Sequence, residues 1–293
     1  MIAEEIAARL WPGREVEIEA LGGGITNHNF KVTVDGEDLV LRIGGKDTEL
    51  LGIDREDENG ASRAAAEVGV GAEVIDFVRP EGYLLTRFIE GRPIPVEEML
   101  RPERIVRVAE TLRRIHDGPD VPGRFDSFRV VEVYRATAEA YGVQVPKSYP
   151  WAKGVGDEIG AARGPQPLRP CHNDLLNANF LEDGERIRIV DWEYAGMGDV
   201  FFDLANFSIN HELGPSENAA LLEAYFGEAD PAHGASLVLM RFMSDFREAM
   251  WGVVQQGISE LDVDFVAYAT EHFERLERTG RDPSFRAALG MFG

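Results

Sequence analysis

Cysteine is almost absent from the 293-residue chain, since Cys171 is the only one. A single cysteine excludes an intramolecular disulfide and a zinc site built from several cysteines. We expect Cys171 to be a small buried residue rather than a nucleophile. Long hydrophobic runs are also missing, because no stretch approaches the 18 consecutive apolar residues that a membrane-spanning helix requires.

Basic residues are few, with 30 Lys and Arg against 52 Asp and Glu and a net charge of −22. This charge repels nucleic acid and anionic membrane surfaces, so we expect neither as a partner. A cationic substrate is compatible with it, although acidic surfaces also serve solubility alone. Residues 1–13 carry acids where a signal peptide needs basic residues, so they predict a short amphipathic helix and a cytoplasmic protein.

The first ninety residues carry mainly strand signals. Short runs rich in β-branched residues, bounded by Gly and Asp, predict strands, and one run of suitable length predicts a helix among them. The predicted strands are 15–21, 28–36, 37–45, 73–78 and 82–86, and the predicted helix is 54–68.

After the "EGRP" break at 90–93 the pattern is mainly helical. Apolar residues recur at helical spacing before His116, and two further long runs have the same character. The expected elements are a helix ending at His116, a loop at 118–128, and helices at 236–257 and 262–278.

These elements predict an α+β, bilobal fold. Residues 1–89 would form a small β-rich lobe, and residues 90–293 a larger, mainly helical lobe. A cleft between two such lobes is a usual place for a small-molecule site. The sequence leaves open whether the protein is a monomer or a homodimer.

The run "HNDLLNANF" at 172–180 concentrates polar side chains that suit phosphoryl transfer. This chemistry needs a base that orients the acceptor hydroxyl, and cations that hold the phosphates. His172, Asp174 and Asn179 match the protein-kinase catalytic loop, in which the Asp is the base and an Asn five residues later binds magnesium. Asp191, after the strand-like run "RIRIV", adds a carboxylate that suits Mg²⁺.

Turn formation is the competing interpretation, because Asn and Asp favour turns and a single motif of this kind arises by chance. Here the loop motif, a hairpin after it and an Asp at the end of a strand occur together and in this order. Their combination favours the functional interpretation. His172 is expected to be a structural hydrogen-bonding residue, without a proton-transfer role.

A nucleotide site is expected in the N-terminal lobe. The Gly-rich run "LGGGITNHNF" at 21–30 lies between two predicted strands, where its backbone N–H groups could approach phosphates. Arg42 follows on the next strand, where protein kinases carry a phosphate-binding Lys. Glu58, on the following helix, could pair with Arg42, or it could be a solvated acid within an acidic run.

The motifs together resemble the choline/ethanolamine kinases, which have an aminoglycoside-phosphotransferase-like, protein-kinase-like fold. The resemblance runs in order from about residue 20 to 275. It rests on "GGGITNHNFKV", "LVLRI", "HNDLLNANF", "VDWEY", "FFDLAN" and "MWGVVQQGIS".

The resemblance implies ATP and Mg²⁺ as cofactors, with Asp174 as catalytic base and Asn179 and Asp191 as magnesium ligands. Asp203 would be a buried acid that supports the catalytic loop. The connector between the lobes, Arg87 to Ile89, would contact the adenine. The implied nucleotide-binding residues are Gly23, Gly24, Thr26, Asn27, Asn29, Arg42, Glu58, Arg87, Phe88 and Ile89.

The resemblance also implies a pocket of aromatic and acidic residues around the ammonium group of the substrate. Aromatic faces attract such cations, especially when they are desolvated. Glu248 stands where an animal choline kinase has a second Trp, and Asn210 stands where it has an acid. The implied substrate residues are Asp174, Glu193, Tyr194, Asn210, Glu248, Trp251 and Tyr268.

The function implied by the resemblance is phosphorylation of the hydroxyl of a small cationic amino alcohol, with choline ranked before ethanolamine. One alternative is a kinase of the same fold for another cation, such as an aminoglycoside or thiamine. The "WGVVQQGIS" run argues against an aminoglycoside. A second alternative is an inactive nucleotide-binding scaffold, which the presence of Asp174, Asn179 and Asp191 argues against.

Overall fold

The computed structural model describes residues 2–22, 27–184 and 186–292 of the chain. Its N-terminal part is built around an antiparallel sheet. Its strand order is β1-β2-β3-β5-β4, and the five strands confirm the five predicted from the sequence. Their bounds are β1 (Val16–Leu21), β2 (Asn27–Val34), β3 (Glu37–Gly44), β4 (Val74–Val78) and β5 (Tyr83–Arg87). Gly23, Gly24 and Thr26 of the predicted phosphate loop lie outside the described residues.

The two faces of this sheet differ because side chains alternate along each strand. One face carries Leu39 and Leu41 of β3, which pack in a small apolar cluster with Ile6 of α1 (Ile2–Leu10). The opposite face carries Arg42, and the register places Asn29 of β2 directly across from it. Cross-strand partners share a face, so Asn29 and Arg42 lie on the same side of the sheet.

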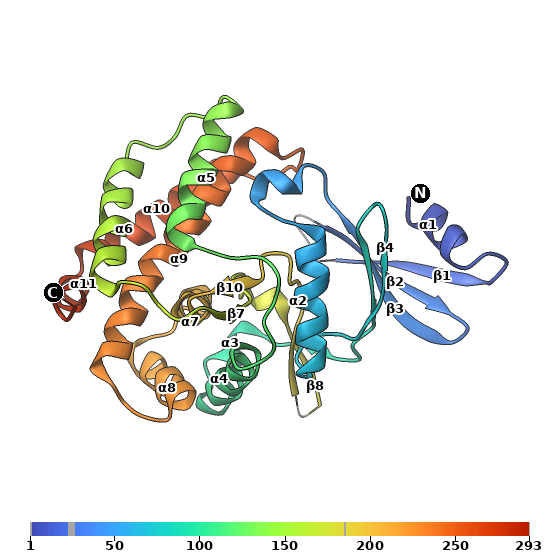
Figure 1. The fold of residues 1–293 in the computed structure, drawn as a ribbon, viewed down its shortest axis with the longest axis horizontal. Helices are drawn as coiled ribbons and strands as arrows, with labels where there is room; N and C mark the ends of the chain where they lie inside the picture. Colours follow the sequence, from blue (N-terminus) through green and yellow to red (C-terminus); the bar gives the residue numbers. More distant parts are fainter. Residues whose placement is uncertain (1, 23–26, 185, 293) are drawn as a thin grey trace.

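Helix α2 (Arg55–Glu67) joins the sheet to the rest of the molecule, and the predicted helix at 54–68 is confirmed. Asp54 caps it by accepting hydrogen bonds from the N–H groups of Glu56 and Asp57. Figure 1 shows α2 standing between the sheet and the helical part. Ala61 and Ala65 belong to the large core formed mainly by residues of the helical part.

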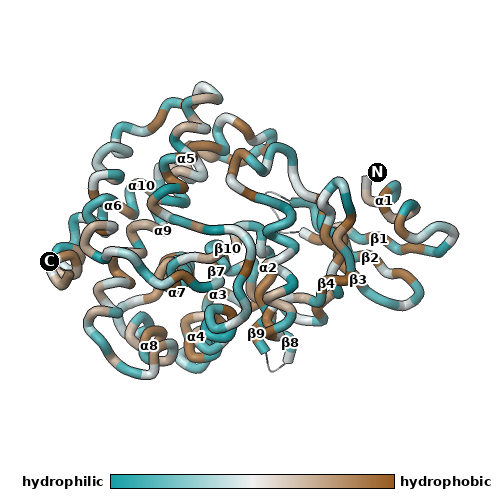
Figure 2. The backbone as a smooth tube through the Cα atoms, viewed as in Figure 1, coloured by the Kyte–Doolittle hydropathy of each residue, from teal (hydrophilic) through white to brown (hydrophobic). Residues whose placement is uncertain are grey.

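The C-terminal part is mainly helical and is centred on α9 (Pro231–Ile258), whose residues are mostly buried from Ala235 to Gln255. In Figure 2 the apolar segments concentrate in the strands of the N-terminal sheet and around α7. The other helices are α3 (Val96–Met99), α4 (Pro102–His116), α5 (Ser127–Ala140), α6 (Tyr149–Arg163), α7 (Val200–Asn210), α8 (Pro215–Phe226), α10 (Phe265–Arg281) and α11 (Pro283–Gly290).

Two small sheets complete this part and flank the motif at 172–180. The first pairs β7 with β10, and the second has the order β6-β8-β9. The strands are β6 (Arg92–Pro93), β7 (Arg169–Cys171), β8 (Phe180–Asp183), β9 (Arg186–Ile189) and β10 (Gly196–Gly198). The described part of the chain has no helix with both the length and the hydrophobicity needed to cross a membrane.

Three helices have other boundaries than the sequence predicted, and their caps explain where they start. The helix predicted at 262–278 is α10 (Phe265–Arg281), where Asp264 accepts from Ala267 N–H. The predicted loop at 118–128 was too long, since Asp126 accepts from the N–H groups of Phe128 and Arg129 and starts α5 at Ser127. The predicted helix at 236–257 starts earlier, at Pro231, where Asp230 accepts from Ala232 N–H. Proline at the first helical position is compatible with such a start, because its missing N–H is not needed there.

Candidate active site

The loop after β7 is held in shape by Asp203 of α7. The fully buried carboxylate of Asp203 accepts hydrogen bonds from the backbone N–H of His172 at 2.8 Å and of Asn173 at 2.7 Å. Asn173 adopts a positive φ of 65°, which Asn tolerates better than most residues. The structure therefore confirms the predicted contact between Asp203 and the catalytic loop.

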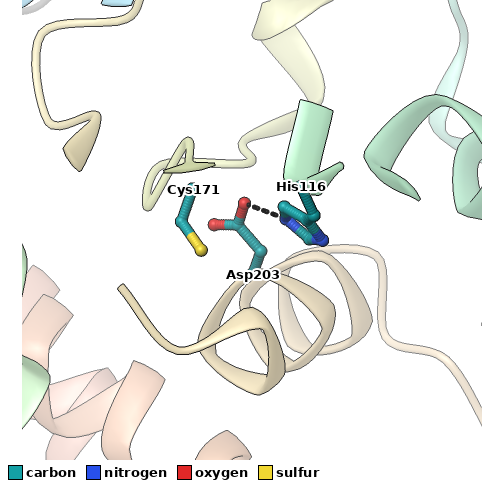
Figure 3. Close-up of side chains that lie close together, drawn as sticks. All are labelled: His116, Cys171 and Asp203. Carbon is teal, nitrogen blue, oxygen red and sulfur yellow. Dashed lines mark hydrogen bonds and ion pairs between the residues drawn. The ribbon is translucent and has the colours of Figure 1, made fainter. Parts of the chain in front are cut away.

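Asp203 also lies beside His116 and Cys171, as Figure 3 shows. One potential ligand atom from each of the three lies within 4.8 Å of the others, a spacing that could suit a metal. However, His116 is bonded on both ring nitrogens, to Tyr225 Oη at 2.7 Å and to Asp203 at 3.0 Å. Burial raises the pKa of the Cys171 thiol well above its usual value. We assign this cluster a structural role.

Asp174 is buried in the same loop, and its carboxylate lies 3.3 Å from Nη1 of Arg247 on α9. Burial raises the pKa of Asp174 to about 8; nearby Arg247 opposes the shift, whereas Glu248 and other acids add to it. A carboxyl group with a raised pKa in a polar cluster is typical of a functional site. The arrangement suits a general base that gains its charge near neutral pH.

Asn179 and Asp191 are brought together by the β8–β9 hairpin. Val190 N–H donates to the carbonyl of Asn179 at 3.0 Å, so the backbone before Asp191 runs beside Asn179. The side-chain Nδ2 of Asn179 donates to the Asp174 carbonyl at 2.8 Å, which leaves its amide oxygen as a potential metal ligand. A carboxylate and an amide oxygen form a hard-oxygen pair that fits Mg²⁺.

Arg42 connects the sheet to this hairpin. Its guanidinium forms ion pairs with the carboxylate of Asp191 and, at 2.7 Å, with that of Glu58. The predicted pairing of Arg42 with Glu58 is confirmed. Although burial lowers the pKa of Arg42, the acids around it raise that pKa by more, so the net shift is upward.

Arg55, at the start of α2, was not predicted as a site residue. Its Nη1 donates to Glu58 at 2.6 Å and to Glu193 at 3.2 Å, and its Nη2 donates to Asn27 at 3.1 Å. Asn27 in turn donates to Glu193 at 2.9 Å. Arg55 thus links two predicted nucleotide-binding residues to a predicted substrate residue. The charged start of a helix three positions before Glu58 was the available sequence signal.

The connector at 87–89 begins at the last residue of β5. Phe88 N–H donates to the Asp38 carbonyl at 3.0 Å, and the Phe88 ring lies 4.7 Å from Nζ of Lys31. Lys31 lies two residues after Asn29 on β2, so its side chain is on the same face of the sheet as Asn29 and Arg42. The Arg87 side chain pairs with Glu73 at 2.7 Å and is 45% exposed. The backbone and Phe88, rather than the Arg87 guanidinium, are suited to meet a nucleotide.

The structure brings together Tyr194, Glu248, Trp251 and Tyr268, which we call the acceptor cage. Trp251 Nε1 donates to Tyr194 Oη at 3.0 Å, and Tyr268 Oη donates to Glu248 at 2.8 Å. The rings of Trp251 and Tyr268 meet edge to face with centroids 5.5 Å apart. The four residues therefore form one connected group of aromatic and acidic side chains.

Arg247 completes this group, although the sequence did not predict it. Its Nη1 donates to Glu248 at 2.5 Å, and its guanidinium lies 4.3 Å from the centroid of the Tyr194 ring. The Arg–Glu pair interrupts an otherwise mainly apolar stretch of α9, which was the available sequence signal.

Glu193 and Asn210, two of the predicted substrate residues, make their described hydrogen bonds outside the acceptor cage. Glu193 accepts from Asn27 and Arg55, on the side of the sheet. Asn210, at the end of α7, donates to the Leu175 carbonyl at 3.4 Å and so supports the catalytic loop. The described contacts therefore attach Asn210 to the loop next to Asp174.

The chain is similar to known phosphotransferases over most of its length. The model of a family described as "Phosphotransferase enzyme family" matches residues 17–236. "Protein LicA" of Haemophilus influenzae is 27% identical over 264 residues, covering 86% of this chain and 76% of that protein. "Ethanolamine kinase 1" of Mus musculus is 24% identical over 328 residues, covering 90% of this chain and 84% of that protein.

Among solved structures, a choline/ethanolamine kinase family protein from Mesorhizobium loti is similar over almost the full length of both chains. The two are 33% identical, and the TM-score is 0.85. The match covers 99% of this chain and 98% of the other.

Proposed function

The chain belongs to the choline/ethanolamine kinase family of phosphotransferases that use an alcohol group as acceptor, and on this premise we propose that it phosphorylates a small amino alcohol, choline or ethanolamine, with Mg·ATP. Family membership implies ATP as the phosphoryl donor. The observation that carries the choice of acceptor is the acceptor cage, which lies beside Asp174 through their shared neighbour Arg247.

In the proposed reaction, Asp174 orients the acceptor hydroxyl and takes up its proton. The hydroxyl oxygen forms a bond to the γ-phosphorus as the bond from that phosphorus to the β-bridging oxygen breaks, and ADP leaves. Asn179 and Asp191 would hold Mg²⁺, which neutralises phosphate charge when it is bound. Asp203 keeps the loop of Asp174 in place through the N–H groups of His172 and Asn173.

Arg42 has a different proposed role at the phosphates. Its present partners are carboxylates, and a guanidinium can exchange a carboxylate for a phosphate because both accept paired hydrogen bonds. If Asp191 held the metal, Arg42 would be available to the phosphates. Residues 1–89 then form the nucleotide-binding lobe, and residues 90–293 form the catalytic and acceptor-binding lobe.

The test is ADP release by the purified protein with Mg·ATP and, in turn, choline, ethanolamine, thiamine, an aminoglycoside or no acceptor. We expect stimulation by choline or ethanolamine well above the rate without acceptor. Stimulation by thiamine or the aminoglycoside instead would overturn the proposed acceptor class. No stimulation by any acceptor would favour the inactive scaffold.

A further inference from the structure

Arg247 places a cation of the protein itself at the acceptor cage. It is 1% exposed and is the bulkiest of the fully buried side chains of the described residues. Its guanidinium contacts the carboxylates of Asp174 and Glu248, and it lies over the ring of Tyr194. These are a catalytic base, an acid and an aromatic face, which are the groups that would otherwise attract the ammonium group of a substrate.

Two hydrogen-bonded ion pairs, both through Nη1, hold this guanidinium. Its Nη1 makes the described contacts, whereas its Nε and Nη2 are shielded from solvent and donate no hydrogen bond. Buried donors without a partner are unfavourable. The ion pairs and the ring contact therefore have to offset that cost, and the guanidinium stays where its two carboxylates and Tyr194 meet.

The guanidinium affects different ammonium groups differently. A quaternary ammonium has no N–H, so it depends on aromatic faces, and the Tyr194 face is already covered by Arg247. A primary ammonium carries three donors. An ionised carboxylate has about four acceptor positions, so Glu248 can accept from Arg247 and Tyr268 and still accept from a primary ammonium.

We propose that Arg247 is the specificity-determining residue of the acceptor site, and that it makes the site favour a primary ammonium, as in ethanolamine, over the quaternary ammonium of choline. This inference rests on the proposed function and narrows its substrate class. It also reverses the order that the aromatic residues alone predicted, because one of their faces is occupied.

Steady-state kinetics of Arg247→Met test the inference. Methionine keeps much of the side-chain bulk, removes the charge and uncovers the Tyr194 face. We expect the wild-type protein to have the higher kcat/KM with ethanolamine. In the variant, the ratio of kcat/KM for choline to that for ethanolamine should rise about tenfold or more, mainly through a lower KM for choline. An unchanged ratio, or a wild-type preference for choline, overturns the proposal.

A binding measurement separates this inference from the proposed function. Calorimetric titration without nucleotide compares tetramethylammonium with methylammonium, which carry the two head groups but no hydroxyl. Arg247→Met should gain affinity for tetramethylammonium relative to wild type. If wild type turns over neither amino alcohol, the proposed function fails, while this titration still decides the role of Arg247. Equal binding of tetramethylammonium by both proteins overturns that role.

Two further variants control for folding and for the loss of an ion pair. Arg247→Met leaves buried Glu248 without its cation, so Arg247→Met/Glu248→Gln removes both charges and should show the same gain for tetramethylammonium. Arg275→Met removes an arginine that pairs with Asp245 of α9 at 2.5 Å. It should leave the choline-to-ethanolamine ratio unchanged. A shift equal to that of Arg247→Met would make the effect unspecific and overturn the proposal.

Discussion

Among the individual side chains, the surroundings of Asp174 matter most for the proposed reaction. Its carboxyl group is surrounded by one guanidinium and several acids, and it is removed from water. Asp174→Asn keeps the shape but cannot accept the hydroxyl proton. We expect kcat to fall about 10²- to 10⁴-fold, with the same melting temperature and the same affinity for Mg·ATP. Retention of more than about a tenth of wild-type kcat would refute the assignment as base.

The raised pKa of Asp174 predicts the pH dependence of the reaction. The base is active only when ionised, so kcat/KM for the amino alcohol should rise with pH and level off above about 8. Burial is the main cause of the shift, and Arg247 is the group that opposes it most. The rise of kcat/KM with pH should therefore occur at higher pH in Arg247→Met. A rate profile with its rise below about pH 6 would indicate that another group titrates.

How far the sequence predicts this site depends on the separation of its parts along the chain. Asp174, Asn179 and Asp191 lie within one loop and one hairpin, so their spacing was readable directly. The acceptor cage was reached only through the family resemblance. Arg247 and Arg55 acquire their roles through partners 73 and 138 positions away, respectively. No local pattern encodes those distances, so only the fold reveals them.

Among helices and strands, local signals sufficed for the N-terminal sheet and less so for helix ends. The β-branched runs between Gly and Asp are short, and they gave all five strands. The start of α9 was missed because its apolar periodicity begins after the helix does. The Asp230–Pro231 pair marks that start by capping and by proline geometry, not by hydrophobicity.

Glu182 connects the β8–β9 hairpin to its surroundings. Its carboxylate accepts from Arg92 and Arg104 at 2.6 Å and from Arg107 at 3.0 Å, which ties β8 to β6 and to α4. The Arg104 hydrogen bond is the main cause that lowers the pKa of Glu182 to about 2. The same hairpin carries the segments of Asn179 and Asp191, so these contacts also support the two proposed metal ligands.

A lowered pKa stabilises the folded state above the pKa of the unfolded chain, and this stabilisation is lost as pH falls from about 4.5 toward about 2. Glu182→Gln should therefore lower the melting temperature at pH 7 and lose less stability than wild type on acidification. Thermal unfolding across this pH range measures both effects. Glu103→Gln, at the start of α4, is the matched control and should follow the wild-type curve.

In the complete chain, ion pairs connect the two lobes. Arg42 pairs with Asp191, and Arg55 with Glu193, so each pair joins the sheet part to the helical part. We expect Arg42→Ala to raise the KM for ATP strongly and Arg42→Lys to raise it less, because lysine keeps a charge but loses the forked geometry. A normal KM for ATP in Arg42→Ala would exclude Arg42 as a phosphate ligand.

The net charge of −22 should affect the two proposed substrates, the amino alcohol and Mg·ATP, in opposite ways. A strongly acidic protein concentrates cations near its surface and repels polyanions, and salt screens both effects. Raising the ionic strength from about 0.01 M to about 0.5 M shortens the screening length from about 30 Å to less than 8 Å. We therefore expect kcat/KM for the amino alcohol to fall several-fold, and kcat/KM for Mg·ATP to hold or rise.

A neutral acceptor separates this screening from any general effect of salt on the enzyme. 3,3-Dimethylbutanol has the shape of choline, with carbon in place of the charged nitrogen. Its kcat/KM should be weak but nearly independent of ionic strength, because it carries no charge for the acidic surface to attract. Equal salt sensitivity of the cationic and neutral acceptors would place the effect on the catalytic step. The charge of the chain would then play no part in gathering its substrate.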